Sequence, residues 1–186
     1  EAQAINMATA KALKNKFGEG YKGVLYGGFM ATADGVKLIE YNARFGDPEA
    51  MNVLPLLDAD FIEICNSIAD GTLNSVDVQF QNKATVCKYA VPEGYPDKPV
   101  KGKPIDVSNV VNTDDLFYAS VDIQNGQLVE AGSRTVAVVG IANTISEAEK
   151  IAENEISAVE GPLFHRTDIG SMQLVNKRVE HMDSLR

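Results

Sequence analysis

The sequence has 186 residues, enough for one large domain or two small ones, and its 45% hydrophobic and 23% charged residues exclude a disordered or low-complexity chain. Its formal net charge of -9 makes nucleic acid and anionic membranes poor partners. No apolar run approaches the roughly 18 residues of a membrane helix, and two cysteines are too few for a disulfide framework, so a reducing, cytoplasmic compartment is expected.

The N-terminal segment is predicted to form a helix followed by a hairpin. Residues 2–17 are rich in helix formers with apolar side chains at helical spacing, and Gly18 stands where a glycine commonly ends a helix. Two strand-like runs follow, at 21–32 and 36–42. They are joined by an Asp-Gly pair, which is typical of a hairpin turn.

Two helices are predicted after the hairpin. Asp47-Pro48-Glu49 indicates a helix start, with Asp47 as the N-cap and proline in the first turn, and Pro55 should end or kink that helix. Residues 58–70 have the pattern of a second, amphipathic helix. This pattern places Cys65 on the apolar face, so we expect Cys65 to be buried, like Cys87 in its strand run.

The pattern changes to strands after about residue 74, where we place a domain boundary. Strand-like runs are predicted at 83–91, 116–123, 127–131 and 134–141. Ser146 and Glu149 have capping-box spacing, which predicts the start of a helix. The sequence therefore predicts the α+β class, with residues 1–74 as one domain and 75–186 as a small mixed β-sheet domain with helices.

Two oxygen-bearing side chains share one face of the predicted strand at 36–42. Strand alternation places Glu40 and Asn42 on the same side, with their Cα atoms roughly 6.5–7 Å apart. Mg²⁺ prefers carboxylate and carbonyl oxygens and often takes one or two protein ligands, completing its shell with water and phosphate. The alternative is an ordinary polar strand end, because Glu-x-Asn is a weak pattern.

Arg44 and Asp47 follow in a glycine-containing loop. The Arg44 guanidinium is either a planar donor fork for a phosphate or carboxylate, or one half of a surface ion pair with Asp47. The role of Asp47 as a helix N-cap would explain that residue without any ligand. The residue types alone leave these alternatives open.

The segments Gly23–Met30 and Leu38–Glu49 resemble the phosphoribosylamine–glycine ligase family, the glycinamide ribonucleotide synthetases of the ATP-grasp group. The string Glu-x-Asn-x-Arg-Phe-Gly-Asp-Pro-Glu is highly specific to this family and its close relatives. Further resemblances follow in family order at 91–96, 132–136 and 166–170. The resemblance implies the C-terminal part of an ATP-grasp fold followed by the family's C-terminal domain.

The resemblance also implies an ATP-dependent ligase of purine biosynthesis. In the family, ATP phosphorylates glycine, and the amine of 5-phosphoribosylamine attacks the glycyl phosphate to give glycinamide ribonucleotide, ADP and phosphate. By position, Glu40 and Asn42 match the family's Mg²⁺ or Mn²⁺ ligands. Arg44 would steady the γ-phosphate or the acyl phosphate, and Asp47 would contact a substrate.

Two features depart from the family pattern. Some members carry a glutamine at the position of Gly28 that contributes to a first metal site, and glycine has no side-chain oxygen. Family enzymes are a little over twice as long, so the chain is expected to be a fragment that lacks the N-terminal domains and is inactive alone. The alternative is a non-catalytic metal- or partner-binding module derived from an ATP-grasp enzyme.

Overall fold

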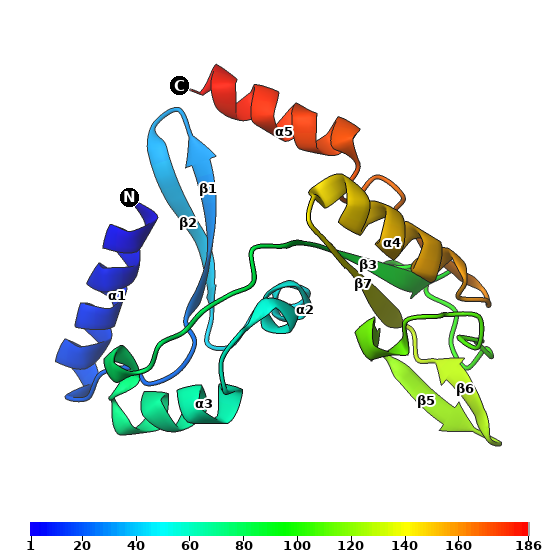
Figure 1. Ribbon diagram of the computed structural model, residues 1–186, viewed down its shortest axis with the longest axis horizontal. Coiled ribbons are helices and arrows are strands. Elements are labelled where there is room, and N and C mark those ends of the chain that lie inside the picture. The colour runs from blue at the N-terminus through cyan, green and yellow to red at the C-terminus, as the bar shows by residue number, and fades with distance from the viewer. Residues whose placement is uncertain (186) are drawn as a thin grey trace. The chain divides into compact units, whose positions relative to one another are not determined.

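The computed structural model describes residues 1–185. This part of the chain forms two compact units (Figure 1): unit 1 is Glu1–Gln81 together with the chain from Arg178 onwards, and unit 2 is Asn82–Lys177. Unit 1 extends to Gln81, whose backbone amide donates to the Leu56 carbonyl at 2.8 Å. The assignment of residues 1–74 and 75–186 to two family domains stays a prediction.

Unit 1 begins with the predicted helix and hairpin. Gly18 ends the first helix in the left-handed conformation, with φ 80°, and its amide donates to the Lys14 carbonyl. The helix packs against the second strand, where the Tyr41 hydroxyl donates to Asn6 Oδ1 at 2.8 Å. These elements are α1 (Ala2–Phe17), β1 (Tyr26–Thr32) and β2 (Gly35–Asn42).

The hairpin register determines which side chains share a face. Tyr26 pairs with Asn42 and Gly28 with Glu40, but the next pair is Phe29 with Leu38. The β-bulge between these pairs interrupts the expected continuous face from Val36 to Asn42. Leu38 is accordingly exposed, rather than directed into the interior.

The helices after the hairpin differ from the predictions in two details. The first begins directly after Pro48 and has no side-chain cap, so the prediction of Asp47 as N-cap is wrong. The second is capped by Asp60, and its inward positions are Ile64 and Ser67. Cys65 follows Ile64 by about 100° around the helix and is exposed, which corrects its expected burial. These elements are α2 (Glu49–Val53), η1 (Leu54–Leu56), α3 (Phe61–Asp70) and η2 (Leu73–Ser75).

Unit 2 contains a four-stranded sheet in the order β4-β7-β3-β8 and a separate β5-β6 hairpin. All pairings between these strands are antiparallel. The expected α+β class is confirmed, with an antiparallel rather than a mixed sheet. The elements are β3 (Ala84–Pro92), η3 (Thr113–Asp115), β4 (Leu116–Tyr118), β5 (Val121–Gln124), β6 (Gln127–Glu130), β7 (Val136–Ala142) and β8 (Leu163–His165).

The helix α4 (Ile145–Ser157) lies on one face of this sheet (Figure 1). Its capping box is formed by Thr144 and Glu147, two residues before the predicted pair. A Cβ at Gly140 of β7 would collide with the Ala148 carbonyl oxygen, so glycine allows the helix backbone to approach the strand. The core beneath the helix consists mainly of Val86, Ala90, Val136, Val138, Ala148, Ala152 and Ile156. The last helix, α5 (Met172–Ser184), contains the division between the units.

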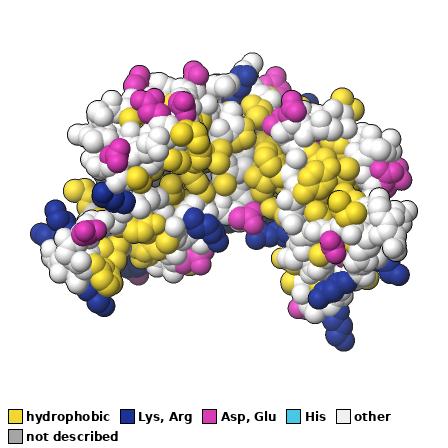
Figure 2. Space-filling model, turned by 90° about the horizontal axis from the view of Figure 1, so that it is seen from below, with side chains coloured by type: hydrophobic (Ala, Val, Ile, Leu, Met, Phe, Trp, Pro, Cys, Tyr) yellow, Lys and Arg dark blue, Asp and Glu magenta, His cyan; other side chains and the backbone are white. Residues whose placement is uncertain are grey.

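Apolar side chains also reach the surface (Figure 2). On the hairpin of unit 1, Met30 is 50% exposed and Ile39 is 61% exposed. Within residues 1–185, no helix has the length and apolar character needed to cross a membrane.

Candidate functional site

The hairpin places Glu40 and Asn42 next to each other, as strand alternation predicts. The Asn42 side-chain amide donates to Glu40 Oε1 at 3.5 Å. Directly opposed residues of antiparallel strands share a face, so Tyr26 and Gly28 lie on the same side as these two residues. Glu40 is exposed and Asn42 half-buried. Their oxygens are therefore available to a ligand on one open face of the hairpin.

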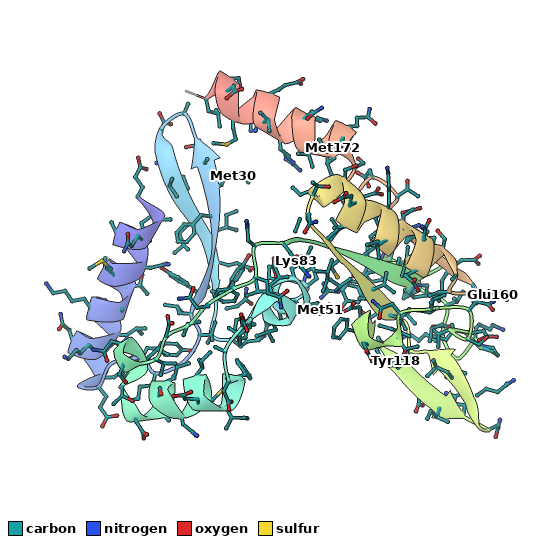
Figure 3. The ribbon with its side chains drawn as sticks, in the orientation of Figure 1. Met30, Met51, Lys83, Tyr118, Glu160 and Met172 are labelled. Atoms are coloured by element: carbon teal, nitrogen blue, oxygen red, sulfur yellow. The ribbon has the colours of Figure 1, made fainter. Side chains whose placement is uncertain are left out.

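Tyr26 and Glu49 complete this face, although sequence reasoning gave neither a role in the site. Burial raises the pKa of Tyr26, and a hydrogen bond to the Glu49 carboxylate and the charges of Glu49 and Glu40 raise it further. Tyr26 therefore stays protonated at neutral pH and is a hydrogen-bond donor. We call Tyr26, Glu40, Asn42 and Glu49 the hairpin site. Figure 3 shows the side chains around it, with Met30 labelled on β1 and Met51 on α2.

The loop between β2 and α2 carries Arg44 and Asp47, and both residues are exposed. The Arg44 guanidinium donates to the carbonyl of Phe45 at 2.7 Å. Phe45 packs against Phe61 of α3, with ring centroids 6.4 Å apart, and lines an apolar pocket of about 300 Å³. The loop is thus anchored by Phe45, while Arg44 remains at the surface.

The hairpin site offers hard oxygen donors without an internal cation. Among the described residues, neither Glu40 nor Glu49 has a Lys, Arg or His ion-pair partner. No group of three or more His, Cys, Asp or Glu side chains in residues 1–185 could enclose a metal ion. A carboxylate and an amide oxygen on an open face fit Mg²⁺ or Mn²⁺ that takes its other ligands from water and phosphate.

A second polar cluster lies in unit 2, and it had no local signal in the sequence. Lys88 of β3 is wholly buried, and its ammonium donates to Glu149 Oε1 at 2.7 Å, to Glu153 Oε2 and to the Thr167 carbonyl at 3.1 Å. The other Glu153 oxygen lies 3.1 Å from His165 Nε2. We call Lys88, Glu149, Glu153 and His165 the Lys88 cluster.

The Lys88 cluster pairs its buried ammonium with two carboxylates. Burial opposes the ionisation of Glu153, but the hydrogen bonds and charges of Lys88 and His165 together outweigh it and lower the pKa of Glu153. All three ammonium protons of Lys88 have acceptors within unit 2. This cluster therefore joins β3 to α4 and to the segment after β8, and it offers no open ligand position on Lys88.

Two family models match the chain. Residues 1–50 match the ATP-grasp (A) domain of phosphoribosylglycinamide synthetase, and residues 85–172 match its C domain. The chain belongs to the phosphoribosylglycinamide synthetase family. The hairpin site and its loop fall within the first match, and the Lys88 cluster falls within the second.

Curated relatives and a solved structure agree with this family. The chain is 55% identical to the phosphoribosylamine–glycine ligase of Methanocaldococcus jannaschii over 100% of its own length and 42% of that protein. It is 51% identical to the ligase of Methanocella arvoryzae, covering 43% of it. The crystal structure of the Thermotoga maritima ligase has a TM-score of 0.69 and 30% identity, over 83% of this chain and 39% of that one. The chain therefore spans less than half the length of these relatives.

Proposed function

We propose that the complete gene product carrying this chain joins glycine to 5-phosphoribosylamine at the expense of ATP. In this reaction the γ-phosphoryl group passes to the glycine carboxylate. The amine then attacks the acyl carbon and displaces phosphate, leaving glycinamide ribonucleotide, ADP and phosphate. The observation that carries the proposal is the adjacent pair Glu40 and Asn42 on the open face of the hairpin, inside the segment that matches the ATP-grasp domain.

Glu40 and Asn42 would hold Mg²⁺ or Mn²⁺ in this enzyme through one carboxylate and one amide oxygen. A bound ion of this kind neutralises charge on nucleotide phosphate oxygens. The support from this structure is the donor set itself, two hard oxygens, with no ion pair to Glu40 within residues 1–185. The amide of Asn42 would turn to present its oxygen, because it now presents its nitrogen to Glu40.

Arg44 and Asp47 are the proposed substrate-contacting residues. Arg44 is exposed, and within residues 1–185 its guanidinium is hydrogen-bonded to one backbone carbonyl, that of Phe45. The guanidinium can therefore reorient towards a phosphate or acyl phosphate. Asp47 is exposed and does not cap α2. A contact between its carboxylate and a substrate is therefore a consistent role, in the same loop as Arg44.

The remaining part of the ligase is the proposed partner of this chain. Met30, Leu38 and Ile39 expose apolar surface on the hairpin, which is costly for a surface that faces only water. The relatives carry more than half of their length outside the matched region. We therefore expect the 186-residue chain to be inactive alone, and we expect the whole enzyme to act in the cytoplasm, without nucleic acid or membrane partners.

The test is glycine-dependent release of ADP by the complete gene product, supplied with ATP, Mg²⁺ and 5-phosphoribosylamine. The proposal expects turnover in the wild-type protein and at least a roughly 100-fold lower kcat/KM in Glu40→Gln, which removes one charged donor. Glu63→Gln is the matched control, because Glu63 is exposed on α3 of the same unit. ATP binding without glycine-dependent turnover in the wild-type protein would favour the non-catalytic module instead.

A further inference from the structure

We propose that the turn between β5 and β6 is a site of spontaneous covalent modification, at which Asn125 loses its side-chain amide and becomes aspartate or isoaspartate. Water is the only co-reactant, so the reaction needs no metal, nucleotide or second protein. The proposal concerns unit 2 and is independent of the ligase function proposed above.

The first observation is the composition and backbone of this turn. Gln124 pairs with Gln127, so that Asn125 and Gly126 form the whole connection between β5 and β6 (Figure 1). Their φ angles are 51° and 78°, both positive, as in the type I′ turns that favour Asn-Gly. Asn125 is also the one asparagine of the sequence that glycine follows directly. The residue pair and the fold therefore place an Asn-Gly bond at the tip of a hairpin.

The second observation is the accessibility of the two reacting groups. Asn125 and Gly126 are both exposed, and a Cβ added to Gly126 would meet nothing within 4 Å. Within residues 1–185, the Gly126 amide donates to no backbone carbonyl. Asparagine side chains readily approach neighbouring backbone N–H groups, and glycine offers no side chain to obstruct that approach. The Gly126 nitrogen is therefore available to the Asn125 side chain.

The modification has two steps. In the first, the Gly126 backbone nitrogen attacks Asn125 Cγ, a new N–Cγ bond forms, the Cγ–Nδ2 bond breaks, and ammonia leaves with the proton of the backbone amide. In the second, water adds to one of the two carbonyls of the cyclic succinimide. Opening at Cγ gives aspartate, and opening at the main-chain carbonyl gives isoaspartate. The net reaction consumes water, releases ammonia, and involves no oxidation or reduction.

Another exposed asparagine, Asn74, provides a contrast within the same chain. The residue after it is Ser75, whose backbone amide donates to the Thr72 carbonyl at 2.9 Å. This nitrogen already has an acceptor, and the serine side chain obstructs ring closure. We therefore expect Asn74 to keep its amide under conditions in which Asn125 loses it.

Isoaspartate should loosen the tip of the hairpin and leave its base in place. It routes the backbone through the asparagine Cβ and lengthens a turn whose length sets the strand register. The base is held from outside the hairpin, because the Glu130 amide donates to the Lys103 carbonyl at 3.0 Å and the Ala131 amide to the Ser120 carbonyl at 2.9 Å. The expected effect is therefore local to residues 122–129.

The experiment incubates the complete gene product at pH 8 and 37 °C and follows each asparagine by peptide mass spectrometry. Asn125 should lose its amide at least roughly tenfold faster than Asn74. An isoaspartate-specific methyltransferase should find a methyl acceptor at position 125 of the aged wild-type protein. Asn125→Gly, which keeps a residue suited to the turn but has no side-chain amide, should yield no acceptor there.

The effect on the hairpin is measured by backbone hydrogen exchange of the isoaspartate form, separated by ion exchange. Exchange across residues 122–129 should be at least about fivefold faster than in fresh protein. Asn125→Asp is the matched control, because it adds the same charge without lengthening the backbone, and its exchange should stay within about twofold of wild type. An Asn125 that loses its amide no faster than Asn74 would overturn the modification site. An isoaspartate form that exchanges as slowly as Asn125→Asp would overturn its effect on the turn.

Discussion

The carboxylates of the two polar clusters differ in whether a cation of the chain is paired with them. In the Lys88 cluster, Glu149 and Glu153 share a buried ammonium whose three protons are all donated within unit 2. In the hairpin site, Glu40 and Glu49 lie near Tyr26 with no ion-pair partner among residues 1–185. A closed cluster of this kind stabilises the fold. Carboxylates that lie on an open face and have no cationic partner are instead suited to bind an external cation.

The largest expected change is a loss of unfolding free energy when the Lys88 cluster is broken. Lys88→Ala leaves Glu149 and Glu153 beside each other without their cation, and also removes the donor to the Thr167 carbonyl. Loss of one partner of a buried ion pair typically costs about 3–5 kcal/mol of unfolding free energy. Urea denaturation of the complete gene product should show this loss in the transition of unit 2. Lys150→Ala, at an exposed position of α4, the helix that carries Glu149 and Glu153, should leave that transition within about 0.5 kcal/mol of wild type. Equal stabilities for the two variants would disprove the structural role of Lys88.

A substitution in the hairpin site should instead lower metal affinity and leave the free energy of unfolding nearly unchanged. Glu40→Gln should change the free energy of unfolding by less than about 0.5 kcal/mol, because Glu40 is exposed and forms no ion pair within residues 1–185. It should weaken Mn²⁺ binding in the presence of ATP by about 100-fold, or about 2.8 kcal/mol. Calorimetric titration and urea denaturation of one preparation check both parts. A variant that loses stability and retains metal affinity would reverse the comparison.

Acid should weaken the closed cluster through Glu153. The pKa of Glu153 is lowered in the folded state from its ordinary value of 4.5, so the unfolded state binds more protons at acid pH. The stabilising contribution is complete above about pH 4.5 and is lost as the pH falls through the lowered pKa. The groups facing Glu153 in this cluster are Lys88 and His165, with Glu149 on the same helix.

The measurement is the urea midpoint at pH 7 and at pH 3, for wild type and Glu153→Gln. The variant should be less stable at pH 7 and should lose less stability on acidification, because its side chain no longer takes up a proton. Asp106 and Asp168 also have lowered pKa values and remain in both proteins, so the difference between the two proteins isolates Glu153. An equal fall in the urea midpoint for both proteins between pH 7 and pH 3 would show that Glu153 does not contribute to the acid dependence of stability.

The smallest expected change is in Mn²⁺ affinity, when one more metal-binding side chain is added to the hairpin site. Gly28 faces Glu40, has no positive φ, and a Cβ there would lie 3.6 Å from Glu40 Cγ, an ordinary contact. Gly28→Gln therefore fits and would add an amide oxygen, which should strengthen Mn²⁺ binding by roughly threefold. Gly28→Leu supplies similar bulk without the oxygen and should not strengthen it. Weaker binding in Gly28→Gln than in Gly28→Leu would contradict this.

Local signals predicted the order of the elements well and their ends less well. Gly18 and the Asp-Gly turn specify one helix end and one hairpin without any help from the rest of the fold. The start of α4 was ambiguous, because Thr144 with Glu147 and Ser146 with Glu149 have the same capping-box spacing. Packing against Gly140 favours the first frame, in which Ala148 and Ala152 face the strand.

The hairpin site was predictable in part, for a related reason. Alternation along β2 alone placed Glu40 beside Asn42. The position of Tyr26 follows from counting pairs back from the turn, but the bulge between Gly28 and Phe29 shifts that count by one residue. The Lys88 cluster was not predictable, because Lys88 and its partners Glu149 and Glu153 lie more than 60 residues apart. Their pairing depends on the packing of α4 against β3.

The most direct test of the central comparison is a crystal structure of the complete gene product with Mn²⁺ and a non-hydrolysable ATP analogue. Data collected at the manganese absorption edge locate the metal independently of any assumed ligand. We predict an anomalous peak bonded to Glu40 and Asn42 oxygens, with Lys88 still holding Glu149 and Glu153. A bound nucleotide whose manganese contacts neither Glu40 nor Asn42, or a manganese ion in the Lys88 cluster, would contradict this account.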